Sequence, residues 1–224
     1  GIGFATAQSS AEKGWNVALC SRDKSQAEKA AAQITSQTKN KNVLGVACDV
    51  ADDASVKALF DVTLTRFGAV DALVNNAGVQ HVGDVFSLSD SQFNEMMQTN
   101  VVGMAYCCRH AFRAMQKDGG SIVNISSLTG FPGTDKYPGL WAYGASKSAV
   151  IGLTEGLATE GRVSKIRVNC IAPGATNTPM LQTNFPEYKA LAMPIDVAKQ
   201  IYYLCDAEQS GIITGATIPI FSNG

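Results

Sequence analysis

Short apolar runs alternate with longer amphipathic segments along the whole chain. Apolar runs predict buried strands, and amphipathic stretches of about ten residues or more predict helices. The predicted strands cover residues 16–20, 43–48, 72–74, 121–125, 166–171 and 216–220. The predicted helices cover residues 4–13, 25–37, 53–67, 91–116, 143–159 and 195–205. This alternation predicts right-handed crossovers and a doubly wound parallel α/β sheet with helices on both faces, in a single domain over residues 1–224.

Aspartates mark the expected beginnings of two helices. Asp90 is expected to cap the helix 91–116, and Asp52 or Asp53 the helix that ends at Phe67. An aspartate at such a position accepts hydrogen bonds from the free backbone N–H groups of the first turn. No internal repeat or linker interrupts the pattern.

Composition restricts the class of protein. The 224 residues are 46% hydrophobic and carry a net charge of −1, without the basic surface that nucleic-acid binding requires. No run approaches the roughly 18 apolar residues of a membrane span. The six cysteines form no CxxC pair and no metal-ligand spacing. We therefore expect reduced thiols in a cytoplasmic protein with no metal, no nucleic-acid partner and no membrane partner.

The first residues, Gly1-Ile2-Gly3-Phe4, are unusual for the start of a helix. Glycine is a poor helix former, but it fits the end of a glycine-rich turn that leads into a helix. We therefore expect this sequence to be a fragment, a truncated reading frame that lacks the first half of the turn.

Suggestive residues follow several predicted strands, where ligands of doubly wound sheets bind. Gly1 and Gly3 would let a pyrophosphate approach the N-terminus of the first helix. Ser21 and Arg22 follow the strand 16–20, where an adenosine ribose would lie. An acidic residue there would bind the ribose 2′-hydroxyl, whereas Arg22 can pair with a 2′-phosphate.

A tyrosine and a lysine stand four residues apart in Tyr143-Gly144-Ala145-Ser146-Lys147. On a helix such residues share one face, one turn apart. The ammonium of Lys147 favours the phenolate, so we expect the pKa of Tyr143 to fall from about 10 toward working pH. General acid–base chemistry needs such a group, although the spacing alone also occurs on many solvated helices.

In combination, these features resemble the short-chain dehydrogenase/reductase family over nearly the whole chain. The resemblance implies a Rossmann-like, three-layer α/β/α fold, with the first strand, which would lie in the middle of the sheet, missing from this chain. The matching motifs are Gly-Ile-Gly at 1–3, Cys-Asp-Val at 48–50, Asn-Asn-Ala-Gly at 75–78, Thr-Asn-Val-Val-Gly at 99–103, Ile-Val-Asn-Ile-Ser-Ser at 122–127, Tyr-Gly-Ala-Ser-Lys at 143–147, Arg-Val-Asn-Cys-Ile-Ala-Pro-Gly at 167–174 and Ile-Thr-Gly at 213–215.

The resemblance implies a catalytic tetrad. Tyr143 would be the general acid in reduction, or the base in oxidation, and Ser127 would hydrogen-bond the substrate oxygen. Lys147 would lower the tyrosine pKa and bind the nicotinamide ribose. Asn100 would position a water in a proton relay behind the lysine.

The resemblance also implies a nicotinamide cofactor. Asp49 would meet the adenine, Asn75 with Gly78 would line the ribose side, and Thr178 would contact the carboxamide. Because residue 21 is not acidic, NADP is favoured, with NAD possible. The implied cofactor-binding residues are Gly1, Ile2, Gly3, Ser21, Arg22, Asp49, Val50, Asn75, Ala77, Gly78, Tyr143, Lys147, Pro173, Gly174, Thr176 and Thr178.

Two departures from the family pattern concern the pocket. Ser127 precedes Tyr143 by sixteen residues rather than the common thirteen, with the extra residues expected in 134–140, and Ser126 remains an alternative for the catalytic role. The segment 180–193, where the family has its substrate lid, is short and has no distinctive chemistry.

Three further side chains leave alternatives open. Tyr137 and Trp141 either contact the substrate or pack the expanded loop. His81 follows the Asn-Asn-Ala-Gly turn and is interpreted as a surface histidine, although contact with substrate or cofactor remains an alternative.

We interpret the sequence as that of an NAD(P)-dependent oxidoreductase that acts on a carbonyl or secondary alcohol, such as a 3-oxoacyl thioester, a small sugar or a steroid. The alternatives are a non-catalytic dinucleotide-binding protein and an inactive fragment of the enzyme. The resemblance further implies a homotetramer or homodimer, in which the helices 91–116 and 143–159 pair between subunits.

Overall fold

The computed structural model describes residues 1–221, and every strand expected from the sequence is present in it. The strands are β1 (Val17–Ser21), β2 (Val43–Ala47), β3 (Ala72–Asn75), β4 (Gly120–Ile125), β5 (Ile166–Pro173) and β6 (Thr217–Ile220). The helices are α1 (Ile2–Glu12), α2 (Lys24–Thr38), α3 (Asp53–Phe67), α4 (Asp90–Met97), η1 (Gln98–Gly103), α5 (Met104–Met115), α6 (Trp141–Gly161), η2 (Arg162–Ser164), α7 (Pro179–Asn184), α8 (Pro194–Cys205) and α9 (Ala207–Ser210).

All strand pairs are parallel, but the strands form two separate sheets. One sheet has the order β1-β2 and the other the order β3-β4-β5-β6. A cavity of about 490 Å³ lies between them, lined by residues of β1, α3 and β3 and of the loops that precede these two strands. The cavity thus separates the two-stranded sheet from the four-stranded sheet.

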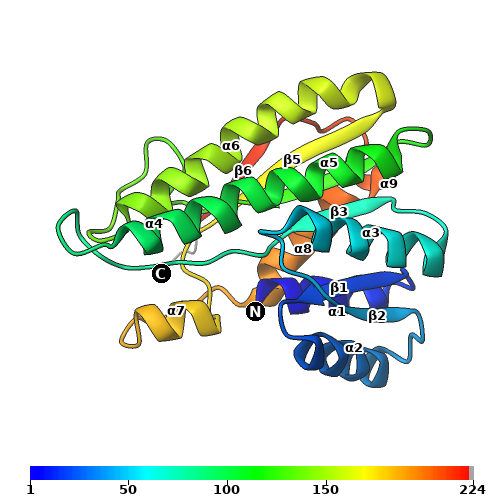
Figure 1. The fold of residues 1–224 in the computed structure, drawn as a ribbon, viewed down its shortest axis with the longest axis horizontal. Coiled ribbons are helices and arrows are strands. Elements are labelled where there is room, and N and C mark those ends of the chain that lie inside the picture. The colour runs from blue at the N-terminus through cyan, green and yellow to red at the C-terminus, as the bar shows by residue number, and fades with distance from the viewer. Residues whose placement is uncertain (222–224) are drawn as a thin grey trace.

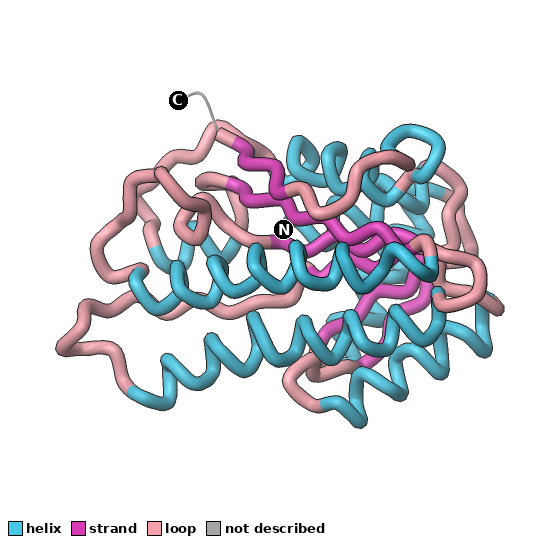
Figure 2. The backbone as a smooth tube through the Cα atoms, turned by 90° about the horizontal axis from the view of Figure 1, so that it is seen from above, coloured by secondary structure: helices cyan, strands magenta, loops and turns pink. Residues whose placement is uncertain are grey.

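Helices cover both faces of the sheets, as the view from above shows (Figure 2). On β4 the alternation of side chains assigns Ile122 to one face and Val123 to the other. Ile122 packs with α3, α5 and α6, which lie on one side, and Val123 with α8 on the other. Helix α2 packs on β1 and β2 (Figure 1). The expected three-layer α/β/α fold is confirmed.

One expected helix differs in the structure, both in its continuity and in its N-cap. The helix expected over residues 91–116 consists of α4, α5 and an intervening π-helix, η1. Its N-cap is Ser89 rather than Asp90, because the Ser89 hydroxyl and the Gln92 side chain satisfy each other's backbone N–H groups in a capping box. Of the two candidates for α3, Asp52 is the cap.

Helices α7 and α9 were not expected from the sequence. Each is short, six and four residues, so neither repeats a hydrophobic period often enough to be recognised. No helix in the described residues 1–221 combines the length and the apolar character that a membrane crossing requires.

Candidate active site

A large cavity of about 840 Å³ opens at the carboxyl ends of β3, β4 and β5. Segments far apart in the chain meet there: the N-terminus of α1, the turns after the three strands, the first turns of α6, and α7. The chain thus follows the general rule that ligands of parallel sheets bind at this edge.

Tyr143 and Lys147 lie one turn apart on α6 and both line this cavity. They are 8% and 5% exposed, so both polar groups are almost removed from water. The Lys147 ammonium donates a hydrogen bond of 2.8 Å to the carbonyl of Ile125, at the end of β4. The same nitrogen lies 5.6 Å from the centre of the Tyr143 ring. The hydrogen bond to the end of β4 therefore fixes the Lys147 ammonium near the Tyr143 ring.

Burial sets the protonation of this pair. Burial raises the pKa of Tyr143 to about 12, and the neighbouring Ser127 hydroxyl acts in the opposite direction. Burial also lowers the pKa of Lys147 to about 8. The sequence-based expectation of a lowered tyrosine pKa is therefore wrong for this structure, because the loss of solvation on burial outweighs the opposing effect of the Ser127 hydroxyl.

The structure separates the two candidate serines. The hydroxyl of Ser126 is buried and donates to the backbone carbonyl of Lys147 at 2.7 Å. The hydroxyl of Ser127 contacts Thr129 instead, at 3.2 Å, and adjoins the Tyr143 phenol. Only Ser127 therefore presents a hydroxyl beside the tyrosine, while Ser126 anchors α6 to the strand end.

Asn100 lies in the π-helix η1 and is 2% exposed. Its amide donates to the carbonyl of Val79 at 2.9 Å and to the hydroxyl of Ser146 at 3.0 Å, and its oxygen accepts from the Val79 N–H at 2.8 Å. The side chain thus ties the turn after β3 to α6 and does not itself line the cavity. A side chain on Gly78 would lie 3.1 Å from the Asn100 oxygen and 3.5 Å from the Lys147 ammonium. Glycine at 78 therefore lets these two groups approach the turn.

The residues expected to hold the pyrophosphate fit such a group. Gly1 is the N-cap of α1 and forms no side-chain cap, so the first N–H groups of the helix have no partner there. Gly1 and Ile2 line the cavity. A side chain on Gly3 would approach the Asn76 amide to 2.6 Å, so the turn after β3 packs directly on the start of α1.

Four predicted residues after β5 lie on the same cavity, namely Pro173, Gly174, Thr176 and Thr178. Thr178 caps α7 by accepting from the N–H of Leu181 at 3.3 Å. A side chain on Gly1 would lie 4.0 Å from Thr178. The loop after β5 and the N-terminus of α1 therefore lie next to each other, on the side of the cavity where the sequence predicts the cofactor.

The turn after β3 differs from the prediction at one residue. The Asn75 amide donates to the side chains of Asn124 at 2.9 Å and Cys108 at 3.2 Å, and Asn75 is not part of the cavity wall. Its neighbour Asn76, which was not selected, lines the cavity together with Ala77 and Gly78. The alternation of side chains at the end of a strand explains why the neighbour, and not Asn75, faces the ligand side.

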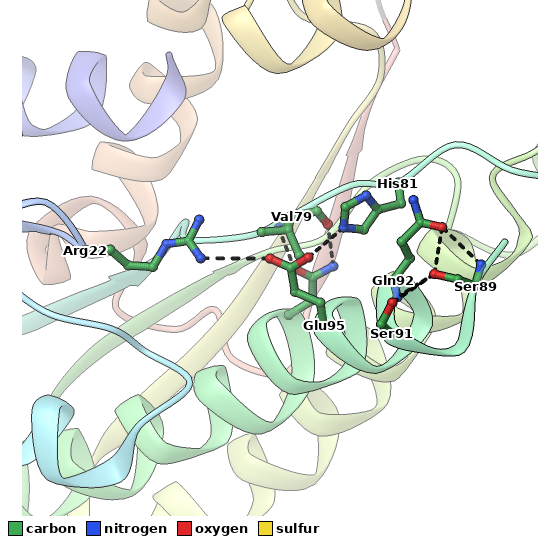
Figure 3. A network of polar contacts seen from close by, with 8 residues as sticks. Arg22, Val79, His81, Ser89, Ser91, Gln92 and Glu95 are labelled. Atoms are coloured by element: carbon green, nitrogen blue, oxygen red, sulfur yellow. Dashed lines mark hydrogen bonds and ion pairs between the residues drawn. The ribbon is translucent and has the colours of Figure 1, made fainter.

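The remaining predicted cofactor residues lie at or just after the ends of β1 and β2 and outside the large cavity, namely Ser21, Arg22, Asp49 and Val50. The guanidinium of Arg22 is 67% exposed and lies 3.9 Å from the carboxylate of Glu95 on α4. That carboxylate also contacts His81 at 2.7 Å, so it stands between the two side chains (Figure 3). His81 therefore belongs to a polar network at the surface.

Sequence reasoning missed the contribution of α7 and the residues after it. Met180, Leu181, Phe185 and Tyr188 line the cavity, and Phe185 packs against the cluster around Tyr143. The expectation that residues 180–193 offer no distinctive chemistry is therefore wrong. The apolar residues of this segment do not repeat a helical period over enough turns to be recognised. The only sequence signal for a cavity wall here was the presence of Met180, Leu181, Phe185 and Tyr188.

The structure gives different surroundings to Tyr137 and Trp141, for which the sequence left either substrate contact or loop packing open. Tyr137 lines the cavity, whereas Trp141 stacks on Phe93 with ring centres 5.8 Å apart. The first therefore faces the ligand side, and the second packs α6 against α4.

Comparison with known proteins identifies relatives over the full length. The family model described as short chain dehydrogenase matches residues 1–189. The 3-oxoacyl-[acyl-carrier-protein] reductase FabG of Chlamydia trachomatis serovar D is 32% identical over 231 residues, which cover 98% of this chain and 91% of that protein.

Two solved structures share the fold and differ in the cofactor that their descriptions name. ElxO with NADP bound is 34% identical, with a TM-score of 0.88, and the match covers 98% of this chain and 92% of that one. The 3-ketoacyl-(acyl-carrier-protein) reductase of Brucella melitensis, complexed with NADH, is 30% identical with a TM-score of 0.88, over 100% and 93% of the two chains.

Proposed function

This chain belongs to the short-chain dehydrogenase/reductase family and is an NAD(P)-dependent oxidoreductase, and we propose that it reduces a carbonyl group to a secondary alcohol with NADPH. The observation that carries the proposal is the buried pair of Tyr143 and Lys147 beside the Ser127 hydroxyl, at the carboxyl ends of the strands. The proposed tetrad is completed by Asn100.

Tyr143 acts as the general acid. Its raised pKa keeps the phenol protonated at neutral pH, so it has a proton to give to a carbonyl oxygen that gains negative charge. Ser127 donates a hydrogen bond to the same oxygen and orients the carbonyl. Lys147, held by the Ile125 carbonyl, stabilises the phenolate that remains after proton transfer.

The cofactor, when bound, supplies the hydride. Its pyrophosphate fits the uncapped N-terminus of α1 at Gly1 and Ile2, and the nicotinamide end fits the wall formed by Pro173, Gly174 and Thr178. Asn76, Ala77 and Gly78 line the ribose side. Asn100 acts as a positioning residue, because it ties the turn after β3 to α6.

NADP is preferred over NAD in this proposal. The exposed guanidinium of Arg22 follows β1, where the adenosine ribose is expected, and Ser21 adds no carboxylate that would repel a 2′-phosphate. Asp49 and Val50, which follow β2, line the adenine side. The Glu95 carboxylate lies 3.9 Å from Arg22 and opposes the binding of a 2′-phosphate, so its substitution tests this proposal directly.

Transfer of label tests the reaction. The protein is incubated with NADPH deuterated at C4 of the nicotinamide and a panel of ketones, and the alcohol products are analysed by mass spectrometry. We expect deuterium on the new C–H of the alcohol and loss of transfer in Tyr143→Phe. Tight NADPH binding with no transfer to any carbonyl would instead support a non-catalytic dinucleotide-binding protein.

We also propose a cytoplasmic homodimer or homotetramer in which α4–α5 and α6 pair between subunits. Side chains at Gly152 and Gly156 of α6 would meet no atom within 4 Å, so this face of the helix is open to a second helix. Sedimentation equilibrium of the protein, compared with a Gly152→Glu variant, would test the interface.

A further inference from the structure

Exposed aromatic and apolar side chains gather on the outer wall of the large cavity. Tyr137, Met180, Tyr188 and Phe221 all line it and are 60%, 38%, 44% and 58% exposed. They come from three separate segments: the loop before α6, α7 with the residues after it, and the end of β6. Large apolar side chains that remain exposed around one concave site indicate that the natural ligand covers them.

The wall carries almost no charge. Of the described side chains that line the cavity, only Asp135 and Lys147 are ionisable acids or bases apart from tyrosines. The ammonium of Lys147 is buried and held by the Ile125 carbonyl. Asp135 is exposed and therefore places a negative charge at the mouth.

The neighbouring Lys136 does not compensate this charge. Its ammonium turns to the carbonyls of Phe131 at 2.6 Å and Leu128 at 3.3 Å, and to the hydroxyl of Thr134 at 2.7 Å. These contacts hold it against the loop backbone. Among the described side chains that line the cavity, an anionic substrate would therefore meet the Asp135 carboxylate and no cation other than the buried Lys147.

The apolar wall is also positioned close to the reacting groups. Phe185 packs against the cluster that contains Tyr143 and Leu140. The amide of Asn184 donates to the Gln80 side chain at 3.0 Å, which ties the end of α7 to the loop after β3. A substituent on a carbonyl held at Tyr143 thus meets the aromatic side chains directly.

We propose that the substrate is an uncharged ketone whose carbonyl bears a hydrophobic ring or a branched apolar group, and that Asp135 selects against anions. This inference rests on the proposed carbonyl reduction and specifies its substrate class. Aromatic side chains contact flat apolar substituents over a large area, whereas a carboxylate near Asp135 would be repelled. A thioester carried on a phosphorylated pantetheine arm is the opposing class, because its carrier is anionic.

A matched pair of substrates tests the charge selection. Methyl phenylglyoxylate and phenylglyoxylate share the ketone and the ring, and they differ in one negative charge. With the full chain and NADPH we expect kcat/KM for the ester to exceed that for the anion by about tenfold or more, mainly through KM. In Asp135→Asn this ratio should fall several-fold, whereas Asp118→Asn, an exposed aspartate before β4, should leave it unchanged.

The aromatic wall is tested in the same assay. Tyr188→Ala should raise KM for the ester several-fold and change kcat little, because Tyr188 contacts the substituent and not the carbonyl. For propanone, a simple aliphatic ketone, the same substitution should raise KM much less.

Three results would overturn the proposal. They are equal or better use of the anion, an ester-to-anion ratio that Asp135→Asn does not change, and a higher kcat/KM for 3-oxobutanoyl-CoA than for the ester. In each of these the reductase activity survives, so only the substrate class fails. Absence of NADPH-dependent reduction with all of these carbonyl compounds would refute the carbonyl reduction itself.

Discussion

The proposed catalytic corner (Asn100, Ser127, Tyr143 and Lys147) and the proposed nucleotide edge (Ser21, Arg22, Asp49 and Val50) are built differently. The catalytic corner lies beside the four-stranded sheet, and buried hydrogen bonds fix the polar groups of Asn100 and Lys147. The nucleotide edge belongs to the two-stranded sheet, and its one long cation, Arg22, is exposed and has only a 3.9 Å ion pair.

This contrast indicates a division of labour. Buried groups have protonation states that the surrounding protein sets, which suits proton transfer. Exposed groups on the edge of a small sheet change partners at little cost, which suits recognition of a phosphate. We therefore expect substitutions in the catalytic corner to act on kcat and substitutions at the nucleotide edge to act on cofactor affinity.

The largest effect is expected from Tyr143→Phe. Loss of the general acid should lower kcat by roughly 10²–10⁴-fold, while NADPH still binds, because the phenol contributes the proton and not the binding surface. Tyr203→Phe on α8, away from the large cavity, is the control and should retain full activity. Steady-state kinetics with NADPH fluorescence titration separates the two quantities, and an unchanged kcat in Tyr143→Phe would contradict the assignment.

A smaller loss of kcat is expected from Gly78→Ala. The new methyl group would approach the Asn100 oxygen to a tight 3.1 Å and would contact the Lys147 ammonium at 3.5 Å. Displacement of these groups should cost about 10–10²-fold in kcat. Gly152→Ala adds the same methyl group on α6 where no atom lies within 4 Å, so activity should be retained. Equal activity of the two variants would show that the corner tolerates rearrangement.

Arg22→Ala tests the nucleotide edge. Removal of the guanidinium should weaken NADPH binding by about tenfold, near the lower limit for a charge-assisted hydrogen bond, and leave NADH binding unchanged. Lys24→Ala removes a neighbouring exposed cation that pairs with Glu28, and it should change neither affinity. Isothermal titration calorimetry with NADPH and NADH measures the two affinities. An equal loss of affinity for both cofactors would count against the 2′-phosphate assignment.

Glu95→Gln should act in the opposite direction. The carboxylate lies 3.9 Å from Arg22 and competes with a phosphate for it. Since exposed ion pairs are worth about 0.2–1 kcal/mol, we expect NADPH to bind up to about fivefold more tightly in the variant. Glu28→Gln, an exposed acid on α2, is the matched control. Weaker NADPH binding in Glu95→Gln would mean that Glu95 orients Arg22 instead.

The pH dependence of stability tests the burial of the catalytic lysine. The pKa of Lys147 is lowered to about 8 from 10.5 in water, so between pH 8 and 10.5 the unfolded chain binds more protons at this residue. Its contribution to stability therefore rises with pH in this window. Relative to Lys147→Met, the wild-type Tm should increase from pH 8 to pH 10, by about 2–4 °C for each kcal/mol.

The control is Lys199→Met, an exposed lysine on α8 that should show no such trend. Differential scanning fluorimetry at a series of pH values gives both curves. A pH-independent difference between wild type and Lys147→Met would mean that the ammonium stays solvated.

Much of the fold and site could be predicted from the sequence. Every strand was located, because alternating or continuous apolar runs bounded by polar turns are local signals. The tetrad and most residues at the strand ends were selected from motifs, and Tyr143, Lys147 and Ser127 do meet in one cavity.

Two failures at the site share one physical cause. Asn75 was selected and Asn76 was not, although Asn75 turns to Asn124 and Cys108 on other elements. The expected fall in the pKa of Tyr143 assumed a solvated pair, whereas the phenol is buried. Each error concerns a contact between a side chain and residues that are distant in the sequence. The local sequence pattern carries no information about such contacts.

The sequence by itself determined the order of strands and helices, the family motifs and the spacing of the candidate acid–base pair, because periodicity and spacing are properties of the local chain. Only the tertiary structure decided which of two adjacent side chains faces the cavity, which charge stands near Arg22, and what lines the mouth. Burial and electrostatics depend on atoms brought together by folding, such as Phe185 beside Tyr143 and Glu95 beside Arg22. Those contacts decide which side chains are buried, and they define the surface that a substrate meets.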